Sequence, residues 1–133
     1  MTSKIEIKLR DAQNIPRDFY QHDQLAHVIR SDEEAIEVAK QLAVSFAKEA
    51  SDRDYERRLP LQEVQQYSAS GLWGITIPKQ FGGAGVSYKT LAEVVKIISS
   101  ADSSLGQIAQ NHWAFLEHIR LDASPEQQEF FFE

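Results

Sequence analysis

The feature that most constrains this chain is a helix start signal followed by a helical apolar repeat. Ser31-Asp32-Glu33-Glu34 has the form of a capping box, in which a serine hydroxyl accepts a hydrogen bond from the amide three residues on and the glutamate returns to the serine amide. Behind this box, apolar residues recur at helical spacing: Ala35, Ile36, Ala39, Leu42, Ala43, Phe46, Ala47 and Ala50. The spacing predicts an amphipathic helix to about Ala50, continuing into the charged run 52–58 as a solvent-exposed, salt-bridging end.

Two further helices follow from local start and stop signals. Pro60 suits the first turn of a second helix, and Gly71 can end that helix in a left-handed conformation. Ser87 is placed to cap a third helix. Between these helices, the short apolar segment 72–78 ends in a proline, so we expect an extended and largely buried connector there.

The last third of the chain predicts one long helix and the start of another. Asp102, Ser103 or Ser104 can cap the long helix, and Ser124-Pro125-Glu126-Gln127 begins the next. Three consecutive phenylalanines, 130–132, follow almost at once. Soluble monomers avoid exposing so large an apolar patch. We therefore expect 133 residues to be the length of a piece rather than of a whole protein.

Taken together, these signals predict an all-α fold. The helices over 31–133 are expected to pack as a bundle-like layer that forms one domain. Residues 1–30 show little periodicity and are expected to form an irregular N-terminal arm. Within this arm, Ile5, Ile7 and Leu9 alternate with charged residues, a pattern that is compatible with a short strand.

Composition removes several classes of function. The chain has 14 basic and 20 acidic side chains, a formal net charge of -6, and no cysteine. The acidic balance disfavours non-specific nucleic-acid binding, which needs a basic stripe. The lack of cysteine excludes disulfides, thiolate nucleophiles and cysteine-ligated metal centres. No apolar run approaches the roughly 18 residues of a membrane span, and the first ten residues lack the apolar segment of a signal peptide. We therefore expect a cytoplasmic protein with no membrane partner.

His112 is the residue that the helical pattern singles out as a site candidate. It lies on the apolar stripe of its helix, between Ile108 and Leu116. Two interpretations stay open from the residues alone. The ring is either a core histidine whose nitrogens are satisfied by backbone or a neighbour, or a pocket histidine that exchanges a proton near neutral pH. In the second case Asn111 and Phe115 flank it and line the same cavity.

Neither a phosphate site nor a metal site is indicated. In the glycine-rich loop, Gly83 and Gly85 fit the dinucleotide fingerprint, but its third glycine is replaced by Tyr88. A turn with close backbone packing is therefore the favoured interpretation. His118 lies on a different face of the helix from His112, so the two have no metal-ligand spacing.

Residues 71–85, GLWGITIPKQFGGAG, strongly resemble the acyl-CoA dehydrogenase superfamily. The N-terminal helical domain of that family carries a G-L-x-G-I-x-x-P-x-x-F/Y-G-G-x-G signature between its second and third helices. The resemblance extends over 31–133 and implies the fold of that domain. It also implies that a flavin-binding β-domain and a C-terminal helical domain complete such a protein.

Within this superfamily, the segments 57–60, 68–76 and 104–112 are most similar to the sulfur-acquisition oxidoreductases, relatives of the flavin monooxygenases that desulfurise organosulfur compounds. The resemblance implies a monooxygenase that uses reduced flavin and oxygen, FMN rather than FAD, on a small organosulfur substrate. It further implies a separate flavin reductase as electron source, and a homo-oligomer, tetramer or dimer, when the protein is full length.

The same resemblance gives His112 a role. His112 stands twelve residues before Ser124, where the desulfurising relatives have a histidine that lines the flavin pocket. This match implies that His112 is catalytic, with Asn111 and Phe115 as substrate-binding neighbours. Most flavin contacts of the family lie in the later domains. This chain alone is therefore expected neither to retain flavin nor to catalyse a reaction.

Two other functions remain open at this stage. One is a true acyl-CoA dehydrogenase, in which the same domain walls the acyl pocket. The other is a helical interaction module with no catalysis. Reduction of bound flavin by an acyl-CoA favours the first, whereas a soluble, monodisperse chain that is complete as encoded favours the second.

Overall fold

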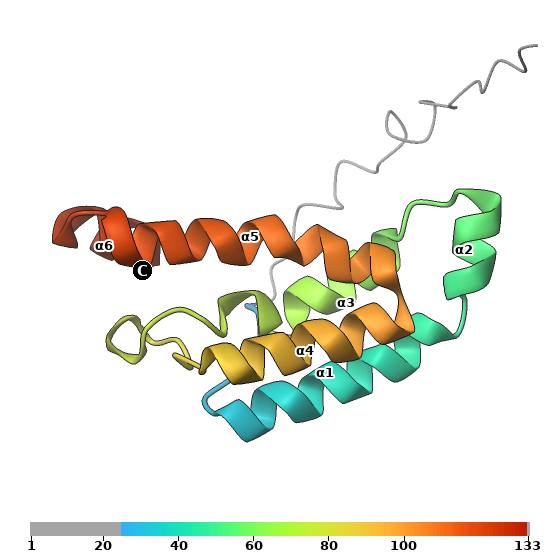
Figure 1. The fold of residues 1–133 in the computed structure, drawn as a ribbon, viewed down its shortest axis with the longest axis horizontal. Coiled ribbons are helices and arrows are strands. Elements are labelled where there is room, and N and C mark those ends of the chain that lie inside the picture. Colours follow the sequence, from blue (N-terminus) through green and yellow to red (C-terminus); the bar gives the residue numbers. More distant parts are fainter. Residues whose placement is uncertain (1–24, 133) are drawn as a thin grey trace, which may run out of the picture.

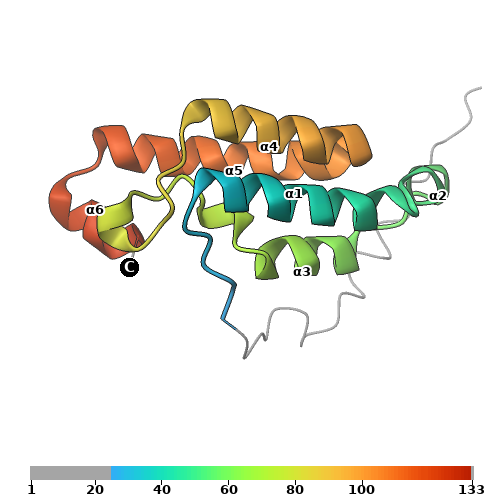
Figure 2. The same ribbon diagram turned by 90° about the horizontal axis from the view of Figure 1, so that it is seen from below.

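The computed structural model describes residues 25–132 and confirms an all-α fold for them (Figure 1). Helix α4 (Tyr88–Ala101) packs against both α1 (Asp32–Ala47) and α5 (Ser103–Asp122), so the three long helices lie side by side (Figure 2). Three shorter helices complete this part of the chain, namely α2 (Ala50–Glu56), α3 (Leu61–Ala69) and α6 (Pro125–Phe132). No strand occurs between residues 25 and 132, and the strand pattern near Ile5 lies outside the described residues.

The predicted helix caps are present. The hydroxyl of Ser31 accepts the Glu34 amide at 3.1 Å, and that of Ser87 accepts the Thr90 amide at 3.2 Å. Asp102 Oδ1 accepts two first-turn amides of α5, at 2.9 and 3.1 Å. The second half of the first capping box differs from the prediction, because the Glu34 carboxylate accepts the amide of Arg30 at 2.8 Å.

The start of α6 shows both halves of a capping box. The Gln127 amide donates to the Ser124 hydroxyl at 3.3 Å, and the Ser124 amide donates to the Gln127 side chain at 2.9 Å. Phe132 at the end of α6 is buried, with its ring 5.2 Å from that of Phe81. The two phenylalanines before it remain 80% and 58% exposed.

The first helix is shorter than predicted. It ends at Ala47, and Glu49, with φ −125° and ψ 14°, turns the chain into α2. As a result, the Phe46 carbonyl accepts Nη2 of Arg53 at 2.6 Å rather than a backbone amide of a continuing helix. Arg53 is only 5% exposed, so the prediction of a fully solvent-exposed charged run is wrong at this residue.

The predicted extended connector 72–78 instead begins with a 3₁₀ turn, η3 (Leu72–Gly74), and a second 3₁₀ turn, η4 (Lys79–Phe81), follows it. Its side chains are buried as expected, with Leu72 and Ile75 fully inaccessible. Among the described residues, 25–132, no neighbouring strand supplies partners for the buried backbone of this segment, so its amides bond locally. The Ile75 amide, for example, donates to the Leu72 carbonyl at 3.4 Å.

The chain that precedes α1 packs on the glycine that ends α3. The His27 amide donates to the Ala69 carbonyl at 2.9 Å, and Ile29 is buried beside Gly71. Gly71 has φ +82°, and a Cβ there would lie 2.0 Å from the His27 carbonyl oxygen. Glycine is therefore required at this position by both backbone conformation and close approach.

Small residues let α1 and α4 pack closely. Ala35 and Ala39 of α1 are completely buried, as are Val94 and Ile98 of α4. The largest fully buried side chains, Tyr67 and Phe46, fill the space toward α3. In the part of the chain that the structure describes, no helix has the length and apolarity needed to cross a membrane.

Candidate functional site

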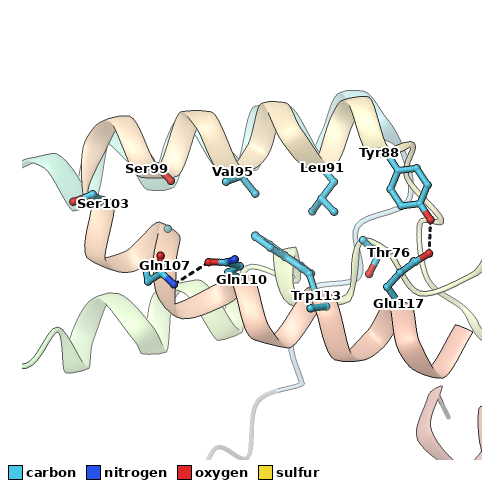
Figure 3. Close-up of a pocket in the computed structure, with 12 residues that line it drawn as sticks. Thr76, Tyr88, Leu91, Val95, Ser99, Ser103, Gln107, Gln110, Trp113 and Glu117 are labelled. Atoms are coloured by element: carbon cyan, nitrogen blue, oxygen red, sulfur yellow. Dashed lines mark hydrogen bonds between the residues drawn. The ribbon is translucent and has the colours of Figure 1, made fainter. Parts of the chain in front are cut away.

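A groove of about 530 Å³ runs between α4 and α5 (Figure 3). Leu91 and Val95 of α4 and Trp113 of α5 provide its apolar walls. The polar residues that line it are Thr76, Tyr88, Ser99, Ser103, Gln107, Gln110 and Glu117. We call this cavity the α4–α5 groove. An apolar middle with polar side chains around it is typical of a small-molecule site.

One end of the α4–α5 groove holds a charged cluster. The Tyr88 hydroxyl donates to the Glu117 carboxylate (Figure 3). It also accepts Nη2 of Arg120 at 2.9 Å. Arg120 also donates through both Nε, at 3.0 Å, and Nη2 to Glu117. These hydrogen bonds, first from Arg120 and then from Tyr88, hold the pKa of Glu117 below its ordinary value. Glu117 is therefore an anion at neutral pH.

Thr76 lies at the same end of the groove, between Trp113 and Glu117 (Figure 3). Its Oγ1 is buried and has no hydrogen-bond partner within residues 25–132. A buried hydroxyl without a partner costs free energy. The Thr76 hydroxyl is thus a group that can gain a hydrogen-bond partner when the side chains around it rearrange on ligand binding.

His112 does not line the α4–α5 groove. It is partly buried on another side of α5, where Nε2 lies 2.9 Å from the Trp73 carbonyl oxygen. The imidazole and the Trp73 indole have ring centroids 4.9 Å apart and an interplanar angle of 55°. The position of His112 on the inward-facing side of α5 is as predicted, and the partner that holds it is a backbone carbonyl.

The structure does not bring Asn111 and Phe115 into a cavity with His112. Asn111 is exposed, and Phe115 is 69% exposed on the outer surface of α5. The helix geometry explains the direction of Asn111, because residues three or four apart share a face and adjacent residues do not. Gly106, Gln110, Trp113 and Glu117 have that spacing and therefore face α4.

The residues of the α4–α5 groove could not be grouped from the sequence, because they come from separate helices and from the segment before α4. Tyr88 and Glu117, for example, are 29 positions apart. One local signal was present, namely Gly106 inside a helix. A Cβ there would lie 2.1 Å from Ser99 Oγ, so this glycine marks the close approach of α4 and α5.

The glycine-rich loop is a structural turn, as predicted. The Gly85 amide donates to the Ile77 carbonyl at 2.9 Å, and the Gly83 amide donates to the Pro78 carbonyl at 3.3 Å. A Cβ on Gly83 would lie 2.1 Å from that Ile77 oxygen. These two amides are used inside the loop and are not available for a phosphate. No group of three or more potential metal ligands occurs within residues 25–132.

The edge formed by Trp73 and His112 fits one wall of a flavin site. A flavin ring needs flat apolar surfaces and a few hydrogen-bonding atoms around it. The indole and imidazole supply both, and the exposed Phe115 ring follows one turn along α5. The indole Nε1 is buried and lacks a hydrogen-bond partner among the described residues. No phosphate cradle accompanies this wall in the glycine loop.

The fold is an all-α domain with an apolar groove between α4 and α5 and an aromatic edge on another side of α5. Residues 30–133 match the family model of the acyl-CoA dehydrogenase N-terminal domain. The chain belongs to the acyl-CoA dehydrogenase family, and it is the N-terminal helical domain that the match covers.

The chain is similar to curated enzymes of sulfur metabolism. It is 34% identical over 99 residues to a protein of Pseudomonas putida named "Probable FMNH2-dependent monooxygenase SfnC", covering 74% of this chain and 25% of that protein. It is 33% identical over 102 residues to a dibenzothiophene monooxygenase of Rhodococcus erythropolis, covering 77% and 24%. A 3-sulfinopropanoyl-CoA desulfinase of Cupriavidus necator is 34% identical over 64 residues, covering 48% and 16%.

The chain thus spans about a quarter of the length of the two monooxygenases. No solved structure matches it.

Proposed function

We propose that this chain is the N-terminal domain of a flavin-dependent monooxygenase that acts on organosulfur compounds. The observation that carries the proposal is the similarity, over about three quarters of the chain, to two monooxygenases whose names specify FMNH2 and dibenzothiophene. The domain extends over 31–133, with residues 1–30 as an arm. In the full-length protein, further domains supply most of the contacts to flavin.

Each surface of α5 has a part in this proposal. The α4–α5 groove offers an apolar cavity walled by Leu91, Val95 and Trp113, apart from the face assigned to the substrate. The edge with Trp73 and His112 lies against the flavin, which when bound supplies the reaction with oxygen. His112 is the catalytic residue and holds or moves a proton at its imidazole.

Asn111 and Phe115 touch the substrate in the full-length protein, where later domains cover their face of α5. Their present exposure supports this assignment, because an exposed aromatic side chain on a helix surface is a common interface residue. The groove and this face are separate surfaces, so variants of each are expected to affect binding independently.

The remaining parts of the proposal concern partners. FMN rather than FAD is the cofactor, and a separate reductase delivers it in reduced form. The full-length protein is a cytoplasmic homo-oligomer, a tetramer or dimer. The name of the Pseudomonas relative, which specifies FMNH2, supports the choice of flavin.

The experiment uses the full-length protein with FMN, a flavin reductase, NADH and ¹⁸O₂. The substrates are dibenzothiophene and a dialkyl sulfone, and products are measured by mass spectrometry. We expect one ¹⁸O atom in an oxygenated sulfur product, and no product when the reductase is omitted. Absence of labelled product from both substrates with active reductase contradicts the proposal.

One observation favours a second candidate, a flavin enzyme of a CoA thioester. The desulfinase relative matches about half of the chain, and its name specifies a sulfinopropanoyl-CoA. Anaerobic mixing of the flavin-loaded full-length protein with a short acyl-CoA separates the two. Bleaching of the flavin absorbance supports the acyl-CoA dehydrogenase alternative, and an unchanged spectrum counts against it.

A further inference from the structure

The hydrogen bond between His112 and Trp73 determines which imidazole nitrogen carries the proton. Nε2 of His112 lies 2.9 Å from the Trp73 carbonyl oxygen. A carbonyl oxygen can only accept, so Nε2 must be the donor and must bear a hydrogen. In a neutral imidazole one nitrogen is protonated and the other holds a lone pair. The lone pair of neutral His112 is therefore on Nδ1.

The Trp73 carbonyl is available because of the turn that contains it. In η3, the Gly74 amide donates to the Gly71 carbonyl at 3.1 Å, and the Ile75 amide donates to the Leu72 carbonyl at 3.4 Å. Within residues 25–132, no backbone amide outside a regular helix is bonded to the carbonyl of Trp73. A side-chain donor is therefore needed to satisfy that oxygen, and His112 provides it.

A second bond beside this one makes the arrangement rigid. Nε1 of Trp113 donates to the Leu72 carbonyl at 3.2 Å. Two consecutive side chains of α5 thus bond to two consecutive carbonyls of η3. The Trp73 indole, with its centroid 4.9 Å from that of the imidazole, closes one side of the ring. Both the position and the tautomer of His112 are fixed by the fold.

The other nitrogen of His112 is free. Nδ1 has no hydrogen-bond partner among the described residues, and it is not one of the buried side-chain atoms left without a partner. It therefore reaches solvent. The neighbours of His112 on that part of α5 include Ile108, 41% exposed, and Phe115, 69% exposed. Nδ1 thus opens onto a partly apolar surface.

We propose that Nδ1 is the atom through which His112 acts, accepting a hydrogen bond or proton from an N–H or O–H group bound against this edge, with the Trp73 carbonyl as the positioning group. This inference rests on the proposed function for the identity of the bound group, a flavin or its substrate. It goes beyond that function by assigning the atom, its tautomer and the backbone group that sets both. A ligand with only acceptor atoms at this place is disfavoured while the imidazole is neutral.

The first test is a tautomer measurement on the 133-residue chain itself. Long-range ¹H–¹⁵N NMR correlations of ¹⁵N-histidine-labelled protein are recorded at about pH 8, with the His112→Gln variant used to assign the signal. We expect His112 to show a protonated Nε2 and an unprotonated Nδ1. A protonated Nδ1, or the equal mixture typical of a free side chain, overturns the proposal regardless of any activity.

The second test compares two substitutions in the full-length protein. The amide of His112→Gln reaches the Nε2 position and can still donate to the Trp73 carbonyl, whereas that of His112→Asn approximates the Nδ1 position. We expect His112→Gln to keep the melting temperature and lose about 100-fold in kcat. We expect His112→Asn to be less stable but to keep more activity.

The reverse order, with the Gln variant more active than the Asn variant, overturns the role of Nδ1. If even the unmodified protein oxygenates no sulfur compound, the proposed function fails, and the NMR measurement alone decides the tautomer. The two failures are therefore distinguishable.

Discussion

Two arginines in this domain bind carboxylates in opposite surroundings. Arg53 is 5% exposed and donates to Glu63 at 2.9 Å and to Asp102 at 2.8 Å. Arg120 is 37% exposed and donates to Glu117, which is itself 26% exposed. The same chemical pair is thus buried between helices in one place and half solvated at the end of the α4–α5 groove in the other.

The difference assigns the two clusters different roles. A buried charge that loses its partner costs several kcal/mol, whereas an exposed pair contributes about 0–1 kcal/mol. Asp102 also connects the buried cluster to the start of α5, because its Oδ2 accepts from Arg53 while its Oδ1 caps the helix. The buried cluster therefore fixes where α5 begins, and the half-exposed cluster can rearrange around a ligand at little cost.

The largest expected effect comes from removing the buried cation. Arg53→Met leaves the Glu63 and Asp102 carboxylates without their partner and the Phe46 carbonyl without its donor. We expect a loss of about 3–5 kcal/mol in the free energy of unfolding, measured by urea denaturation. Arg58→Met, at a side chain 44% exposed, is the matched control and should change stability by less than about 0.5 kcal/mol. Equal effects of the two variants would remove the contrast between buried and exposed arginines.

The next effect separates the two functions of Asp102. Asp102→Asn keeps an oxygen that can cap α5 but removes the charge that Arg53 binds. We expect a loss of about 1–2 kcal/mol, with the helix content by circular dichroism unchanged. Asp102→Ala, which also removes the cap, should lose about 1 kcal/mol more. If the Asn and Ala variants are equally stable, the cap contributes nothing measurable.

A smaller effect is expected at the half-exposed cluster. Glu117→Gln should lower stability at neutral pH by less than about 1 kcal/mol. Because the folded-state pKa of Glu117 lies below its ordinary value of 4.5, the contribution of the carboxylate is present above that pH and is lost as pH falls through the lowered pKa. Melting curves of both proteins between pH 7 and pH 3 check this, with Glu129→Gln, at an exposed side chain outside the groove, as the control. A difference that grows on acidification contradicts the assignment.

The smallest effect is expected to be a gain. Arg57 ends α2 with φ 55°, a left-handed conformation that glycine adopts without strain. Arg57→Gly should therefore raise the free energy of unfolding by about 0.5 kcal/mol, measured by thermal melting. Arg58→Gly, one residue on, is the control and should give no gain. A clear loss in Arg57→Gly would indicate that the Arg57 side chain contributes to the buried cluster nearby.

The sequence predicted what depends on neighbours along the chain. Ser31, Ser87 and Asp102 cap their helices because a side-chain oxygen bonds amides two or three residues away. The predicted end of α1 was wrong, because the helix end depends on a hydrogen bond from Arg53 to the Phe46 carbonyl. Arg53 is itself positioned by Asp102, 49 residues further along the chain. No window of sequence contains that interaction.

The same limit applies to the candidate site. The inward direction of His112 followed from helical spacing, but its bond to Trp73 joins residues 39 positions apart. The α4–α5 groove was not predicted, since it exists only where two helices meet. Asn111 is adjacent to His112 in the sequence, and on a helix adjacent residues point in different directions. Phe115, three positions after His112, is 69% exposed. The roles of all three residues remain predictions for the full-length protein.

The contact between Gly106 and Ser99 provides a means of altering what the groove accepts. A methyl group at position 106 would lie 2.1 Å from Ser99 Oγ and 3.1 Å from its Cα, so the two helices would have to separate there. Ser99 stands at the end of the groove remote from Glu117 (Figure 3), and Gly106 packs against it. Gly106→Ala is therefore expected to separate α4 from α5 at this end of the groove. The substitution can widen the cavity and leave the charged cluster at the other end unchanged.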